Sequence, residues 1–200
     1  INIIALISIV GVLFGTMAMV IVLSVFNGFD DIIRNLYQSI DADFKIELKE
    51  GQFFQSNNNL FQKINDIEGI KSFSEVLEYK MLAHYSDHEL VVDVKGVDKN
   101  YLSLNSLEDS IVVGNYFYEK NNFLIVGLPI FNRFSLKLLD FENPLKLSFF
   151  KETGGLDINN SIQTYPFYVS GAFQTHTEFD NTYILLQIDK LREILFLQNK

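Results

Sequence analysis

The sequence predicts an α+β fold in which an N-terminal transmembrane helix continues into a mixed α+β domain outside the cytoplasm. Three observations carry this prediction. Residues 1–29 contain no charged side chain, and every Lys, Arg, Asp and Glu follows them. Segments with alternating apolar residues, typical of strands, occupy much of the chain after residue 40. Short helical patterns lie between them without the regular rhythm of a parallel βαβ protein.

The composition excludes several classes of protein. Hydrophobic residues make up 48% of the 200-residue chain and charged residues 20%, which is typical of a folded protein rather than a disordered one. The net charge is −9 and basic residues do not cluster, so nucleic acid is not expected as a partner. The chain has no cysteine, which excludes disulfides and thiolate metal sites.

Residues 1–28 are predicted to cross a membrane. The run INIIALISIVGVLFGTMAMVIVLSVF has 26 residues and one polar amide, at Asn2. As a helix it would extend roughly 39 Å, more than the ~30 Å of a bilayer core. A signal peptide fits less well, because the run is too long and shows neither a basic start nor an Ala-x-Ala-like cleavage site. A buried core helix of this length without one charge is rare.

Two features of this helix concern its partners and its orientation. Small residues recur three, four and three positions apart, at Ser8, Gly11, Gly15 and Ala18. Such a strip allows close approach of another helix in lipid, although small residues are also simply common in membrane helices. The first charges after the run are acidic, with Arg34 nearby, which favours placing residues 29–200 outside the cytoplasm.

The helical pattern continues beyond the apolar run, to Ile40. The dipeptide Asn27-Gly28 usually signals a turn, and the glycine costs a helix about 1 kcal/mol. Apolar residues nevertheless recur at spacings of three and four from Phe29 onward. We therefore predict a kink at Asn27-Gly28 where the helix leaves the bilayer, rather than a helix end.

The domain over residues 29–200 is predicted from its apolar periodicity. Alternation or short apolar runs predict strands, and spacings of three and four predict helices. The expected strands are 43–49, 70–85, 88–97, 111–114, 123–127, 144–151, 164–173 and 181–187, and the expected helices are 60–67, 128–136 and 189–197.

Motifs for catalysis are absent from the sequence. There is no Gly-Lys-Ser/Thr for nucleotide binding and no Gly-x-Ser-x-Gly nucleophile turn, so neither an enzyme nor a catalytic residue is predicted. His84 and His88 have the spacing of a helical metal pair, but their strand-like flanks indicate a hairpin tip, and no metal site is expected. Glu178 and Asp180 lie in a loop that leads into a strand, where carboxylates are usually solvated.

One stretch resembles a known family. Residues 7–36 are similar to the first membrane helix, and its exit, of lipoprotein-releasing (Lol-type) ABC transporter permeases of the FtsX/MacB-like superfamily. The specific part is Val22-Leu23-Ser24-Val25-Phe26-Asn27-Gly28-Phe29. Weaker similarity covers 94–98, 122–136 and 167–195. The family's Gly-hydrophobic-Asp motif is Gly96-Val97-Asp98 here, and the proline that often follows it is replaced by Lys99.

This resemblance implies the architecture and the partners. Residues 29–200 would form a MacB-type periplasmic core domain, inserted after the first of four membrane helices. The chain would lie in the inner membrane with this domain in the periplasm. It would pair with a second permease copy or a sister permease, and a separate ABC ATPase subunit would bind the ATP. No cofactor is expected in this chain.

The resemblance also implies candidate sites for a lipoprotein substrate. Its acyl chains would contact Met19, Val22 and Phe26 near the outer end of the helix, although lipid contact or bundle packing is the plain alternative. Asn27, Gly28 and Phe29 would form a lever that couples the helix to the domain. The loop 151–163 would dock a periplasmic lipoprotein carrier, or would be only a connection, and its candidate residues are Lys151, Gly154, Gly155, Asn159 and Gln163.

Other functions share this layout. A MacB-like export permease or an FtsX-like signalling permease would have the same first helix and domain. A single-pass anchored α+β binding or sensor domain is the alternative from another class. The small-residue strip argues against that alternative, because a plain anchor does not need such a face.

Overall fold

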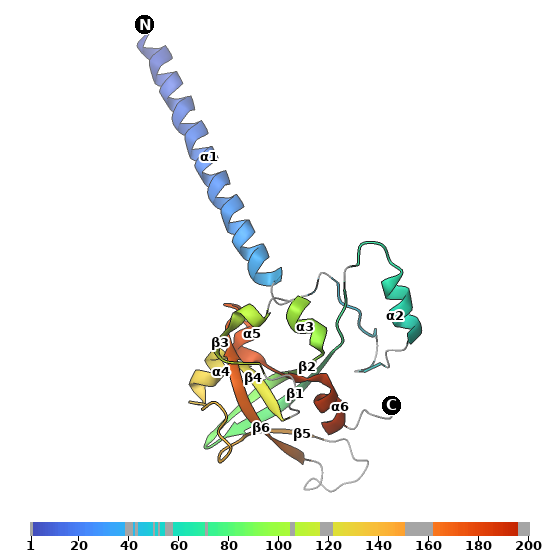
Figure 1. Cartoon of the computed structure of the whole chain (residues 1–200). Helices are drawn as coiled ribbons and strands as arrows, with labels where there is room; N and C mark the ends of the chain where they lie inside the picture. Colours follow the sequence, from blue (N-terminus) through green and yellow to red (C-terminus); the bar gives the residue numbers. More distant parts are fainter. Residues whose placement is uncertain are drawn as a thin grey trace. The chain divides into compact units, whose positions relative to one another are not determined.

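The computed structural model describes residues 2–38, 42, 44–49, 51, 53–54, 58–70, 72–104, 107–116, 122–150 and 162–195. The chain divides into two compact units, Ile1–Gln38 and Ser39–Lys200 (Figure 1). This division agrees with a helical N-terminus followed by a separate folded domain, and each unit is described by itself below.

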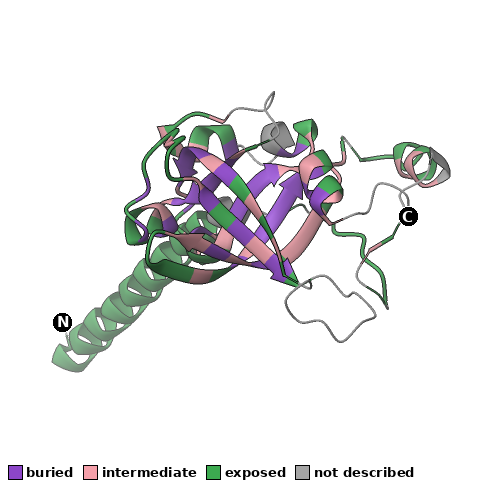
Figure 2. Cartoon of the chain, turned by 90° about the horizontal axis from the view of Figure 1, so that it is seen from below, coloured by how far each residue is buried: buried purple, intermediate pink, exposed green. Residues whose placement is uncertain are grey.

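The first unit is one long helix, α1 (Ile3–Gln38). It continues through Asn27-Gly28, so the predicted passage of the helix beyond that pair is confirmed. Its stretch Ile3–Ile33 is long and apolar enough to cross a membrane, with a mean hydropathy of 2.7 and no residue of its most apolar window buried. Figure 2 shows the helix exposed along its length.

The described residues of the second unit form seven strands. Five of the predicted strands agree closely with observed ones, and β1 and β6 differ at their starts. The strands are β1 (Val76–Tyr85), β2 (His88–Val97), β3 (Ile111–Gly114), β4 (Phe123–Gly127), β5 (Leu145–Phe150), β6 (Ile162–Phe173) and β7 (Tyr183–Gln187).

The strands form a closed ring. Their order is β3-β6-β4-β7-β2-β1-β5, and β5 also pairs with β6. The 12-residue β6 makes this possible, because its first half pairs with β5 and its second half with β4 and β3. The pairs β2–β7 and β4–β6 are parallel, and the others are antiparallel. Six strands therefore close a small barrel, to which β3 is added.

Alternate residues of all six ring strands fill one core. This follows from strand geometry, since successive side chains point to opposite faces and a closed ring encloses one of them. The buried strand residues of this core are Met81, Ala83, Val92, Val94, Leu124, Val126, Leu145, Leu147, Phe149, Phe167, Val169, Ala172, Ile184 and Leu186. Figure 2 shows the buried strands together.

A second, smaller core forms on other faces of the strands. Ile125 and Leu185, the residues between those of the first core, pack with Val97 and Phe173. Tyr101 of α3 (Lys99–Leu104) and Leu107 of the 3-10 helix η1 (Leu107–Ser110) complete this core. The ring is thus packed inside by its strands and covered on part of its outside by short helices.

The remaining helices are short. Helices α2 (Asn58–Asn65), α4 (Leu128–Arg133) and α6 (Ile188–Ile194) agree with predicted ones. Helices α3 and α5 (Phe179–Thr182) and η1 were not predicted, because four to six residues are too few to show a helical period.

One predicted strand does not form in its described residues, and two others begin at a different residue. Segment 43–49 forms no strand in its described residues 44–49. Strand β1 begins at Val76 rather than residue 70, and β6 begins at Ile162 rather than residue 164. Alternation in the sequence predicts an apolar and a polar face. A strand also requires a partner for its backbone, however, and the pattern does not reveal that partner.

Gly127 provides a test of the packing between the barrel and α5. A Cβ atom at this position would lie 1.8 Å from the Asp180 carbonyl oxygen. We expect Gly127→Ala to lower the free energy of unfolding of the domain by about 1–3 kcal/mol, because backbone atoms must move. Denaturant unfolding of the full chain in detergent measures this change.

Gly28→Ala is the matched control, because no atom lies within 4 Å of a Cβ at Gly28. It should leave the unfolding of the domain unchanged. Equal stability of Gly127→Ala and wild type would contradict the close approach of α5 to β4.

Candidate functional site

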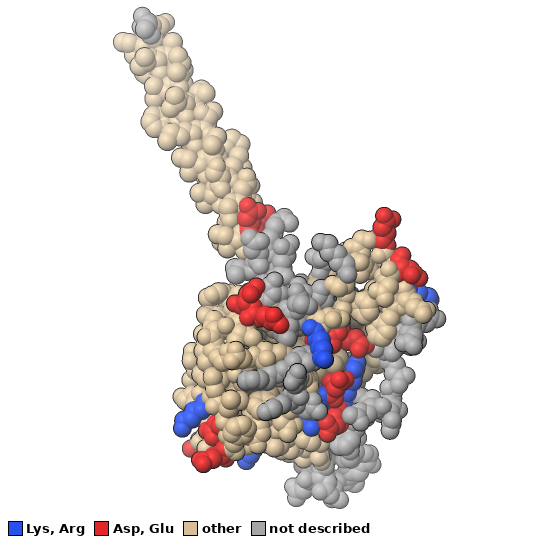
Figure 3. Space-filling view, in the orientation of Figure 1, with Lys and Arg blue, Asp and Glu red and all other residues tan. Residues whose placement is uncertain are grey.

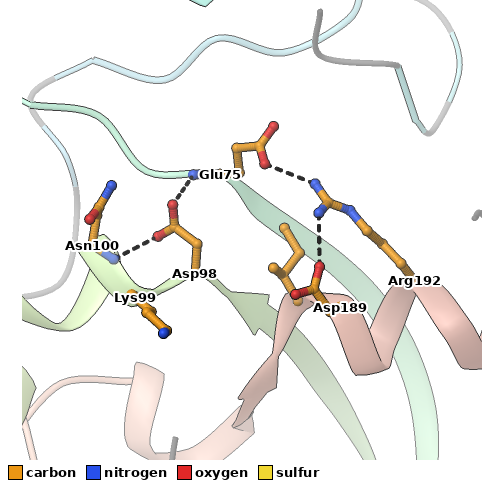
Figure 4. A pocket seen from close by; sticks show the side chains of 7 residues that line it. Glu75, Asp98, Lys99, Asn100, Asp189 and Arg192 are labelled. Atoms are coloured by element: carbon orange, nitrogen blue, oxygen red, sulfur yellow. Dashed lines mark hydrogen bonds and ion pairs between the residues drawn. The ribbon is translucent and has the colours of Figure 1, made fainter. Parts of the chain in front are cut away.

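A polar pocket of about 320 Å³ lies where β2 ends, α3 begins and α6 passes the start of β1 (Figure 4). Charged residues predominate among those that line it. The residues that line the pocket are Glu75, Asp98, Lys99, Asn100, Ile188, Asp189 and Arg192.

Asp98 organises one wall of the pocket. Its Oδ1 accepts hydrogen bonds from the backbone N–H groups of Asn100 (3.1 Å) and Tyr101 (3.0 Å), so it caps the N-terminus of α3. The Ser74 hydroxyl donates to the same oxygen, and the Glu75 N–H donates to Oδ2 (3.2 Å). One carboxylate thus joins the end of β2, the start of α3 and the chain that enters β1.

This arrangement gives a physical meaning to the Gly96-Val97-Asp98 motif. A Cβ at Gly96 would lie 3.0 Å from both the Ile188 Cα and the Leu191 Cβ, so glycine allows α6 to pack closely against β2. Asp98 is the helix cap, and Lys99 occupies the first helical position, where proline is favoured. The replacement of proline by lysine therefore leaves the local structure intact.

Arg192 forms the opposite wall. Its Nη2 lies 3.0 Å from the Glu75 Oε2, and its Nη1 lies 3.2 Å from the Asp189 Oδ1. Figure 4 shows the guanidinium between the two carboxylates. These two ion pairs connect α6 to the chain that enters β1.

A buried lysine lies beside this region, on β2. Lys95 is 7% exposed, its Nζ lies 3.0 Å from the Glu78 Oε1, and the rings of Tyr101, Phe179 and Tyr183 surround it at 5.1–5.6 Å. Burial by itself would lower the pKa of Lys95, but its interactions with Tyr101 and Glu78 outweigh this and raise the pKa. The ammonium therefore stays charged and links the second core to β1.

A buried carboxylate organises the loop before α5. Asp180 is 3% exposed and accepts hydrogen bonds from the Thr175 N–H (2.9 Å), the Thr175 hydroxyl (2.6 Å) and the His176 N–H (2.9 Å). The prediction that Asp180 is solvated is wrong, because these donors replace water. Glu178 is exposed, as predicted. The only sequence signal was the cluster of Thr and Asp residues, which is too common to be specific.

The histidines His84 and His88 lie at the predicted hairpin between β1 and β2. Residues 86–87 form the turn between β1 and β2, and His84 lies opposite Glu89 with 3.3 Å between its Nδ1 and the Glu89 Oε1. Within the described part of the chain, no three His, Asp or Glu residues are grouped so that they could hold a metal ion.

The predicted membrane sites all lie on α1. With 3.6 residues per turn, the small strip (Ser8, Gly11, Gly15, Ala18) and the predicted lining residues (Met19, Val22, Phe26) share a sector of roughly 100°. The large members of this sector are exposed, Met19 at 66% and Phe26 at 65%. One helix face therefore changes from small residues in its first half to bulky ones in its second half.

Two hydroxyl groups of this helix form hydrogen bonds within it. The hydroxyl of Ser8 donates to the Ile4 carbonyl (3.0 Å), and that of Thr16 donates to the Val12 carbonyl (3.0 Å). Asn27, Gly28 and Phe29 lie within the continuous helix. Charged side chains begin only near its C-terminal end (Figure 3).

The predicted carrier-docking loop is mostly outside the described residues, which is the case for Lys151, Gly154, Gly155 and Asn159. Gln163 is described, and its assignment to a loop is wrong. It lies in β6 opposite Phe149 of β5, because the alternation of β6 extends two residues further toward the N-terminus than the sequence indicated.

Comparison with known proteins gives structural similarity only. No protein-family profile matches the sequence, and no curated protein matches it. Among solved structures, the extracellular domain of the ABC-type transporter YknZ from Gram-positive bacteria is 12% identical with a TM-score of 0.44. That match covers 68% of this chain and 64% of the YknZ domain.

A second similar structure is a domain of a protein described as a permease from Porphyromonas gingivalis. It is 12% identical with a TM-score of 0.41, and the match covers 62% of this chain and 49% of that one. Both TM-scores are below 0.5, so neither match decides the function of this chain.

Asp98 should contribute more stability than any other charge of the pocket. We expect Asp98→Ala to lower the free energy of unfolding by about 2 kcal/mol, because α3 loses its cap and the Glu75 N–H loses its acceptor. Asp189→Ala is the matched control in the same pocket. Its side chain is 84% exposed, and an exposed ion pair contributes less than about 1 kcal/mol. Equal losses in urea unfolding would contradict the role of Asp98.

Asp180 allows a second test. Asp180→Asn replaces one acceptor oxygen by a donor that faces the N–H groups of Thr175 and His176. We expect a loss of about 3 kcal/mol in unfolding free energy, since hydrogen bonds to a charged acceptor are lost. Glu178→Gln, at an exposed position two residues away, should change the free energy of unfolding little. A stable Asp180→Asn variant would show that the loop does not depend on the carboxylate.

Proposed function

We propose that this chain comprises the first membrane helix and the extracytoplasmic domain of an ABC transporter permease of the lipoprotein-releasing type. The observation that carries the proposal is the continuous α1. The run Val22–Phe29, which resembles that family, lies inside one helix whose stretch Ile3–Ile33 is long and apolar enough to cross a membrane and which does not end at Asn27-Gly28. An ordinary anchor would need no helical continuation beyond the bilayer.

The proposed mechanism divides the work between subunits. The 200-residue sequence has no Gly-Lys-Ser/Thr motif. As the family resemblance implies, we assign the binding and hydrolysis of ATP to a separate ABC ATPase subunit. Movement driven by that subunit reaches the periplasmic domain through α1, which is stiff because its backbone hydrogen bonds are unbroken across the exit. The chain acts as a permease in the inner membrane and not as an enzyme.

The substrate site is assigned to the mixed face of α1. The small residues Gly11 and Gly15 allow a helix of a second permease copy or a sister permease to approach closely. Met19, Val22 and Phe26 keep the same partner further away, because their side chains are larger. The wider half of this interface would receive the acyl chains of a lipoprotein, which a periplasmic carrier then accepts.

A release assay tests the proposal. The native permease, purified with its partner subunits and reconstituted with a labelled lipoprotein, should release it to a soluble carrier only when ATP is hydrolysed. Hydrolysis with release of another substrate would favour an export permease. Hydrolysis that activates a periplasmic enzyme instead would favour an FtsX-like signalling permease, and a protein that binds no ATPase would be an anchored sensor or binding domain.

A flexible insertion in α1 tests the lever. We expect insertion of Gly-Ser after Gly28 to abolish transport while ATP hydrolysis continues, because the helix no longer transmits force. The same insertion after Gly69 is the control, since Gly69 lies in an exposed turn with nothing within 4 Å of a Cβ. Full transport by the Gly28 variant would contradict the lever.

A further inference from the structure

Segment 44–48 has the properties of a strand without having a partner among the described residues. Its apolar residues Phe44, Ile46 and Leu48 alternate with charged ones and are 87%, 59% and 41% exposed. Lys45 and Glu47 lie on one side, with 3.2 Å between the Lys45 Nζ and the Glu47 Oε2. Alternation of this kind is expected for a strand with one buried face. In the structure these apolar residues are exposed instead.

The barrel has an open strand edge that is about as long as segment 44–48. All of β1 pairs with β2, but on its other side β1 pairs with β5 only over Leu82–His84. Within the part of the chain that the structure describes, no strand pairs with residues 76–81 on that side. Such an edge presents unpaired backbone groups and accepts an added strand readily.

The open edge has two different faces. Leu77, Tyr79 and Met81 belong to the inner core or pack against it. Glu78 and Lys80 lie on the outer face, where each is paired across to β2, Glu78 with Lys95 (3.0 Å) and Lys80 with Asp93 (2.6 Å). An added strand must therefore place apolar residues inside and charges of the right sign outside.

We propose that segment 44–48 adds to this edge of β1 as a parallel strand of the same chain, with Lys45 beside Glu78 and Glu47 beside Lys80. In this register Phe44, Ile46 and Leu48 lie beside Leu77, Tyr79 and Met81, over the core. The outer charges then alternate across three strands, as Lys95, Glu78 and Lys45 in one row and Asp93, Lys80 and Glu47 in the next. Opposite charges in neighbouring strands favour this register.

The antiparallel register that places Glu47 beside Lys80 is blocked. It also matches charges, with Glu47 beside Lys80 and Lys49 beside Glu78. It would, however, place Phe44 and Lys45 beside Ala83 and Leu82, which already pair with Leu147 and Ser148 of β5. The parallel register ends beside Met81, before this contact begins.

The position of the following residues favours the same chain as the source of the strand. The Phe53 ring stacks on Tyr79 with 6.2 Å between centroids, so the chain five residues after Leu48 already lies at this edge. Gly51 adopts φ +99°, which suits the turn that a parallel strand ending beside Met81 needs in order to return to Tyr79.

The strand would connect the membrane helix to the barrel. Five residues separate Gln38, the last residue of α1, from Phe44. They span at most roughly 20 Å, so a docked strand holds the end of α1 near β1 and an undocked one leaves it free. This consequence rests on the proposed function, whereas the strand pairing itself does not.

Disulfide formation between two introduced cysteines tests the pairing directly, since the 200-residue sequence contains no cysteine. Lys45→Cys/Glu78→Cys in the full chain, in membranes, should form an intrachain disulfide under mild oxidation, because neighbouring strands lie within disulfide reach. Lys49→Cys/Glu78→Cys, the antiparallel pair, and Ile46→Cys/Glu78→Cys, which places the two thiols on opposite faces, should oxidise several-fold more slowly. Glu47→Cys/Lys80→Cys is the second test pair and keeps the Glu78 partner of Lys95.

Each outcome decides the proposal. Fast intrachain disulfides in both test pairs support it. Oxidation that is no faster than in the controls, a faster Lys49 pair, or disulfides between two chains would overturn it. If Glu78→Cys prevents folding, the Glu47/Lys80 pair decides, with Ile46→Cys/Lys80→Cys as its control. The readout needs neither ATP nor substrate, so failure here is distinguishable from failure of ATP-dependent release, which tests the proposed function.

Discussion

The exposed apolar surface of α1 is the constraint on which the rest of the account depends. Burying one Val, Leu, Ile or Phe side chain is worth about 1.5–3 kcal/mol, so a helix with apolar residues exposed along 31 positions would cost on the order of tens of kcal/mol in water. A folded domain is stable by only ~5–15 kcal/mol. The apolar surface of the helix therefore favours a bilayer or other helices as its surroundings, and the proposed membrane anchoring rests on this surface more than on any motif.

Strand pairing and two carboxylates connect the elements of the domain. Its ring is closed by β6, which pairs with β5 in one half and with β4 in the other. Asp98 and Asp180 then fix the chain between strands, each by accepting several hydrogen bonds at one carboxylate. These clamps hold short helices against the barrel, so a force applied at one strand would move the domain as a unit.

Much of this structure could be predicted because the signals are local. A charge-free run predicts most of α1, and strand-like patterns, including the short apolar run of β4, predict β2, β4 and β7 closely. The closure of the ring could not be predicted, since it depends on which distant strands pair. The burial of Asp180 could not be predicted, because its donors, Thr175 and His176, belong to a cluster of polar residues that is too common in loops to be specific. Segment 43–49 shows the limit most clearly, since its pattern specifies two faces but no partner.

The measurement that tests the central claim most directly is the accessibility of single cysteines in intact cells, in a chain that has none of its own. A membrane-impermeant maleimide should label a cysteine at Asp66 in the domain and leave one at Ala18 in α1 unlabelled until the membrane is dissolved. This result would place α1 in the bilayer and the domain outside the cytoplasm. Equal labelling at both positions, or loss of residues 1–38 from the mature protein, would contradict the account.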